Sequence, residues 1–212
     1  MHDSENWAEN QRQFAAPRTF RHTCTPMNLN QHETIIAATR VWVEKAVIGL
    51  NLCPFAKAVH VKGQIRYVVS AARDADALLQ DLSHELEQLA ATDAAQTDTT
   101  LLIHPWVLND FLDYNEFLDV ADAAVEALDL TGRLQVASFH PDYQFADTAP
   151  DDIENCSNRS PYPTLHLLRE ESIDRAVAAF PDADDIYATN IRTLRALGHA
   201  GWDALSSGPQ KK

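Results

Sequence analysis

Residues 99–105 of the chain have the sequence Thr-Thr-Leu-Leu-Ile-His-Pro, and this stretch decides the fold. A short, continuous apolar run is typical of a strand that is covered on both faces of its sheet. Proline has no N–H group to extend the hydrogen-bond ladder, so Pro105 marks the end of the strand. The stretch therefore predicts a sheet with helices packed on it.

Three further strands and five helices are expected on either side of this strand. Apolar runs of strand length occur at residues 65–70, 134–140 and 164–168. Apolar residues at helical spacing predict helices from Asn30 to about Leu50, over 74–89, from Asn109 to about Leu128, over 172–180 and over 182–197, the last ending at Gly198.

The order of these elements predicts an α/β fold with one mixed four-stranded sheet. Strands separated by helices form right-handed βαβ units, which gives three parallel strands. The fourth strand follows the third without a helix, so we expect it to pair antiparallel. We assign residues 30–199 to this single domain, residues 1–29 to a flexible extension and residues 200–212 to a flexible tail.

The composition excludes some classes of protein. A net charge of −14 repels phosphate backbones and anionic lipid, so we expect neither nucleic acid nor a membrane as a partner. Cys24, Cys53 and Cys156 are too few and too scattered for a disulfide framework. Because no signal peptide or membrane-spanning run is present either, we expect a cytoplasmic protein.

Two histidines mark the ends of predicted strands. His104 and His140 each precede a proline, which holds the preceding residue in an extended conformation. In parallel strands both imidazoles would lie at the carboxyl edge of the sheet, where α/β folds commonly bind ligands. The alternative is that each histidine only forms hydrogen bonds to a neighbouring loop.

The connection over residues 141–163 returns to the same edge and is too long to be a simple turn. Its Arg159 could hold a carboxylate or phosphate, or form salt bridges with Asp151, Asp152 or Glu154. The other candidate substrate-binding residues near this edge are Asp142, Tyr143, Asn158, Tyr162 and His166.

Cys53 precedes Pro54, and two geometries give opposite predictions for its thiol. If Cys53 ends the first helix, the negative end of the helix dipole raises the thiol pKa. If Pro54 is the first residue of a new helix, the exposed N–H groups and Lys57 favour the thiolate. A partly buried, unreactive cysteine is the third possibility.

The third predicted helix carries acidic residues without a basic one. Dinuclear metal sites on helices usually add a histidine at i+3, and none is present here. We therefore interpret these residues as a solvated outer face: Asp110, Asp113, Glu116, Asp119, Asp122 and Glu126.

Long motifs in the chain resemble a bacterial family catalogued as domain of unknown function 1415. They are NLCPFAKAVHVKGQIRYVVS, DTTLLIHP, FLDYNEFLDVAD, LQVASFHPDYQFADTAPDDIENCSNRSPYPTLHLLRE and IYATNIRTLRALG, and they cover roughly residues 33 to 198. The resemblance implies one domain across this span, and it implies no reaction or cofactor.

Three functions are compatible with these residues. The first is an enzyme that acts on a small anionic metabolite, with Cys53 as nucleophile, His104 or His140 as base and Arg159 as substrate clamp. The second is a zinc or iron site with His104 and His140 as ligands, joined by His166, Asp142 or Cys53. The third is a module that binds a ligand or partner without catalysis. The sequence itself identifies no cofactor.

Overall fold

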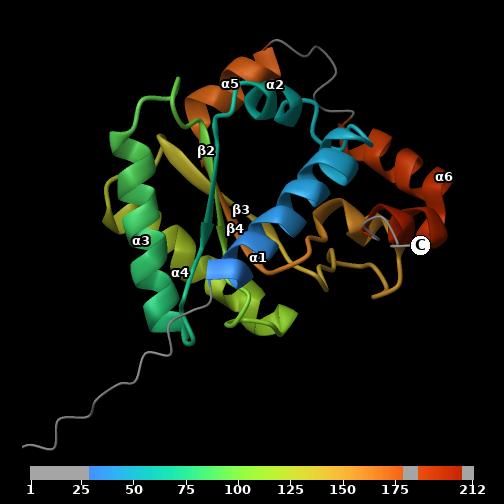
Figure 1. Cartoon of the computed structure of the whole chain (residues 1–212), viewed down its shortest axis with the longest axis horizontal. Helices are drawn as coiled ribbons and strands as arrows, with labels where there is room; N and C mark the ends of the chain where they lie inside the picture. The colour runs from blue at the N-terminus through green and yellow to red at the C-terminus, as the bar shows by residue number, and fades with distance from the viewer. Residues whose placement is uncertain (1–28, 179–185, 207–212) are drawn as a thin grey trace, which may run out of the picture.

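A computed structural model describes residues 29–178 and 186–206 of the chain (Figure 1). The predicted extension lies outside the described residues except for Leu29, the first residue of helix α1. Four strands form one sheet: β1 (Ile65–Val69), β2 (Thr99–Ile103), β3 (Leu134–Phe139) and β4 (Thr164–Arg169). All four were predicted, and the α/β class is confirmed.

The strand order is β1-β2-β4-β3, which corrects the predicted parallel trio. Only β1 and β2 pair in parallel, while β4 lies between β2 and β3 and is antiparallel to both. The reason is that all five residues of β2 are buried, so β2 needs a hydrogen-bonded neighbour on each side. Because β4 is antiparallel to both neighbours, β2 and β3 run in the same direction and still end at the same edge of the sheet.

One face of the sheet is covered by two long helices, α3 (Ala75–Ala91) and α4 (Phe111–Ala127) (Figure 1). The main core lies here, where Leu78, Leu82 and Leu86 pack with Leu102 and Leu167. The Asp74 side chain caps α3, and Asp110, one residue later than predicted, caps α4. The acidic residues of α4 are exposed, so the prediction of a solvated face is confirmed.

The other face is covered less completely. Helix α1 (Leu29–Trp42) continues into a π-helical segment, η1 (Val43–Ile48), and packs its apolar residues on Leu101. The short helices α2 (Ala56–Val61) and α5 (Glu170–Ala178) lie together at one end of this face (Figure 1). Between α1 and the pair formed by α2 and α5, sheet residues such as Leu101, Ala137 and His166 line an open pocket.

Helix α6 (Ile186–Ser206) packs beside the 3-10 helix η2 (Ile153–Asn158), away from the sheet (Figure 1). Gly198 has φ 67°, which confirms the predicted helix end at this glycine. Helical structure then resumes as far as Ser206, so the predicted tail from residue 200 is helical up to that point. Within the described ranges, no helix is long and apolar enough to cross a membrane.

Candidate functional site

The structure brings His104 and His140 together at the carboxyl edge of β2 and β3. Both histidines are fully buried on the face covered by α4, where Tyr114 lies between them. The Tyr114 ring centroid is 5.7 Å from that of His104 and 5.0 Å from that of His140. The edge is therefore a packed aromatic cluster.

His104 ties its strand end to two loops. Its backbone N–H donates to the Pro163 carbonyl, and its ring Nδ1 lies 3.0 Å from the Val107 carbonyl, to which it must donate. Burial lowers the pKa of His104 to about 4, so the ring is neutral at neutral pH. Nε2 then carries only a lone pair, which is buried and has no partner in the described part of the chain.

Both ring nitrogens of His140 form hydrogen bonds to backbone groups of neighbouring loops. Its Nδ1 accepts a hydrogen bond from the Asp142 N–H at 3.0 Å, and its Nε2 is 3.2 Å from the Leu108 carbonyl. Burial lowers the pKa of His140 as well, although the nearby Leu108 carbonyl opposes this effect. These contacts match the alternative in which strand-end histidines hold neighbouring loops.

Most polar groups of the loop over residues 141–163 form hydrogen bonds within the loop, whereas Asn158 bonds to β3 and Glu154 pairs with Arg195. Arg159 donates to the carbonyls of Tyr143 and Pro150, and it forms no salt bridge within the described residues. The Asn158 amide donates to the Ser138 carbonyl, and the Tyr162 carbonyl accepts from two hydroxyl groups. Arg159 therefore stabilises the loop through backbone carbonyls and not through the predicted salt bridges, while its predicted contact with a ligand stays a prediction.

His166 lies on the opposite face of the sheet. Side chains alternate along a strand, and His166 pairs with Leu101 and Ala137, whose side chains face away from α4. The sheet thus separates His166 from His104 and His140. No three His, Cys, Asp or Glu side chains come together to hold a metal in the parts of the chain that the structure describes, so the predicted three-histidine metal site is not assembled.

A pocket of about 1080 Å³ occupies the face that carries His166. Its floor is the sheet, and its walls come from η1, α2, α5 and the loop before β2. The lining is mostly apolar and includes Val47, Phe55, Val59, Leu101, Phe139 and Ile173. A mostly apolar concave site with a few convergent polar groups is typical of small-molecule binding.

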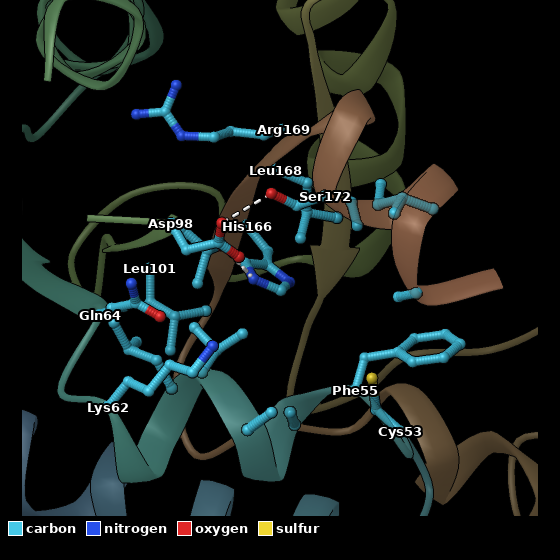
Figure 2. A pocket seen from close by; sticks show the side chains of 18 of the residues that line it. Cys53, Phe55, Lys62, Gln64, Asp98, Leu101, His166, Leu168, Arg169 and Ser172 are labelled. Carbon is cyan, nitrogen blue, oxygen red and sulfur yellow. Dashed lines mark hydrogen bonds between the residues drawn. The ribbon is translucent and has the colours of Figure 1, made fainter. Parts of the chain in front are cut away.

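The polar groups of the pocket are fixed by their neighbours (Figure 2). The Thr99 hydroxyl donates to the Leu167 carbonyl at 2.6 Å and lies 2.7 Å from His166 Nε2. Ser172 donates to Asp98 at 2.6 Å, and the Gln64 amide donates to the carbonyls of residues 94 and 95. Burial lowers the pKa of His166 to about 4, so this ring is neutral too.

The local charge of the pocket differs from that of the whole chain, whose net charge is −14. Lys62, Arg169 and Arg175 line it, against Asp93 and Asp98, and Arg175 is paired with Glu171. The partners of Arg169 are all backbone carbonyls, which do not neutralise its charge. The Lys62 side chain has no hydrogen bond or ion pair in the described ranges, and Figure 2 shows it reaching across the α2 side of the pocket.

Cys53 lies at the far end of the same pocket from Asp98 (Figure 2). It precedes a turn that leads into α2, so neither predicted geometry describes it fully: the helix begins at Ala56. Burial raises the pKa of the Cys53 thiol, and the backbone N–H groups of Phe55 and Ala56 offset this only in part. The thiol form is therefore favoured at neutral pH.

We expect Cys53 to be alkylated slowly at neutral pH because of this raised pKa. The rate of iodoacetamide modification, followed on the Cys53 peptide by mass spectrometry, should rise with an inflection above the ordinary cysteine value of about 8.5. An inflection below about 8.5 would contradict the raised pKa and would support Cys53 as a nucleophile, which reacts as the thiolate.

The sequence interpretation missed Lys62, Gln64, Asp98, Thr99 and Ser172. One signal was available: His166 stands between leucines in a strand whose alternate residues, Leu165 and Leu167, are buried. A polar residue on the second face of such a strand indicates a face that is not filled by a helix.

The model of the family described as "Protein of unknown function (DUF1415)" matches residues 34–204. Neither the curated proteins nor the solved structures gave a match.

Proposed function

Because the chain belongs to the DUF1415 family, whose function is unknown, we propose a function from its own geometry: it binds a small organic anion with an apolar body. The observation that carries the proposal is the pocket of about 1080 Å³ on the sheet face that carries His166. Pockets of this size bury most of a drug-sized ligand. His104 and His140, in contrast, have no solvent-exposed surface.

The anionic class of the ligand rests on the cations of the pocket. The chain as a whole repels anions, yet Lys62 and Arg169 line this pocket without a carboxylate partner in the described residues. Arg169 is held by carbonyl groups, while the Lys62 ammonium is available to a ligand. The apolar lining would hold the remainder of the ligand by burial of its surface.

Catalysis is a second candidate function at the same pocket. It is favoured by the presence of Cys53 and His166 in one lining, two side chains that can act as nucleophile and base. In this proposal the reaction takes place on the face opposite to His104 and His140. Its partner is a small molecule, and its setting is the cytoplasm, where cysteines such as Cys53 stay reduced.

The anion preference can be tested with 3-phenylpropanoate and its neutral amide as probes. We expect the wild-type protein to bind the carboxylate roughly fivefold tighter than the amide by calorimetry, a value typical of one exposed ion pair. Lys62→Gln should remove this preference. Lys57→Gln makes the same charge change on an exposed residue of α2 that does not line the pocket, and should preserve it.

Two variants that fill the pocket with a large side chain test whether the ligand binds there. Ala137→Trp places an indole on the pocket floor, and Ala58→Trp places one on the α2 wall. Both should abolish binding of 3-phenylpropanoate. Binding that survives in both folded variants, or no binding to the wild-type protein, would refute the proposed function.

A further inference from the structure

The hydrogen bonds of His166 determine which of its ring nitrogens is protonated. A threonine hydroxyl has one hydrogen, and that of Thr99 is donated to the Leu167 carbonyl at 2.6 Å. The Thr99 oxygen can therefore only accept from His166 Nε2, which lies 2.7 Å away. Nε2 carries the proton, and in the neutral ring Nδ1 is left with a lone pair.

This lone pair is free for a ligand. No group in residues 29–178 or 186–206 donates to His166 Nδ1. Figure 2 shows the second ring nitrogen of His166, the one without a dashed line, facing the interior of the pocket. His166 is therefore a fixed hydrogen-bond acceptor in a mostly apolar surrounding.

A second acceptor is fixed in the same pocket. Gln64 uses its amide nitrogen to donate to the carbonyls of Ala94 and Ala95, both at 3.0 Å. Because both partners are acceptors, the amide cannot be flipped, and its oxygen is the remaining atom. Figure 2 shows this oxygen on the side of the pocket interior.

We infer that the anion bound in this pocket also carries a hydrogen-bond donor, a hydroxyl or N–H group, that His166 Nδ1 accepts. This inference rests on the proposed function and names its ligand class more closely. A ligand that covers Nδ1 with an apolar group removes water from this acceptor without replacing the hydrogen bond. The resulting cost in binding free energy favours ligands that carry a donor. His166 is thus a specificity-determining residue, in a neutral state that its burial favours.

The test uses 3-phenylpropanoate and its three ring-hydroxylated isomers, which move one hydroxyl through different positions. At least one isomer should bind the wild-type protein roughly tenfold tighter than the parent acid, the value of one hydrogen bond in a partly desolvated site. The bound isomer should also shift the ¹⁵N resonance of His166 Nδ1, which a merely structural histidine would not show.

Two variants remove the acceptor in different ways. His166→Phe deletes it, and Thr99→Val removes the hydroxyl that keeps the proton on Nε2. In both, the ratio between the affinities of the hydroxylated isomer and the parent acid, measured on the same variant, should fall below about twofold. His84→Phe, the same change at an exposed position of α3, should keep the full advantage.

The outcomes separate this inference from the proposed function. If the parent acid binds but no isomer is favoured, or if the advantage persists in both variants, the inference is wrong and the proposed function stands. If neither the parent acid nor any isomer binds the wild-type protein, both are wrong.

Discussion

Replacing Tyr114 with alanine is expected to lower the free energy of unfolding by about 3–5 kcal/mol, as for other large buried aromatic side chains. Tyr114 is fully buried between the rings of His104 and His140. Its hydroxyl donates to the Thr164 carbonyl at 2.9 Å and accepts from the Phe139 N–H at 3.1 Å. It therefore joins α4 to the ends of β3 and β4.

A conservative change separates packing from hydrogen bonding. Tyr114→Phe keeps the ring but removes both of these hydrogen bonds, which costs about 1–3 kcal/mol. Tyr187→Phe, at a position that is 57% exposed, should change stability by less than about 0.5 kcal/mol. Urea unfolding monitored by circular dichroism measures all three variants. A loss below about 1 kcal/mol for Tyr114→Ala would contradict the packed cluster.

Acidification is expected to remove about 3 kcal/mol of stability through His104 alone, given a folded-state pKa of about 4 and an ordinary value of 6.5. Between these values the unfolded chain binds a proton that the folded chain does not. Stability is therefore complete above pH 6.5, falls as the pH falls, and levels off near pH 4 for this group. His140 and His166, whose pKa values are also lowered by burial, change stability in the same direction.

The contribution of His104 can be isolated by comparison. His104→Phe keeps an aromatic ring beside Tyr114 but cannot titrate, so it should be less stable at pH 7.5 and lose less stability on acidification. Carboxylates and the other histidines titrate in both proteins and cancel in the difference. Equal pH slopes for the variant and the wild-type protein would show that His104 is not held neutral by the fold.

The sequence predicted the strands well because their signals are local. The prolines after His104 and His140 predict both strand ends to within one residue, and the glycine at 198 interrupts the last helix as expected. The place of β4 in the strand order, in contrast, is not encoded by local sequence signals. A strand that returns after a loop can join the sheet edge or insert, and the burial of β2 on both sides decides in favour of insertion.

The candidate site was harder to predict for a related reason. His104 and His140 do converge, yet convergence at an edge does not show whether the groups are buried or open to a ligand. The pocket lies on the part of the sheet face that α1, α2 and α5 do not cover, and no sequence motif marks such a part. Lys62, Asp98 and Ser172 come from separate elements, so only the tertiary structure places them together.

We propose that the ligand binds in the pocket beside His166, on the opposite face of the sheet from His104 and His140. Mapping backbone amide shifts by NMR during titration with 3-phenylpropanoate tests this claim most directly. We predict that the largest shifts occur at Thr99, Leu101, Ala137 and His166. Shifts confined to His104, His140 and the loop over residues 141–163 would contradict it.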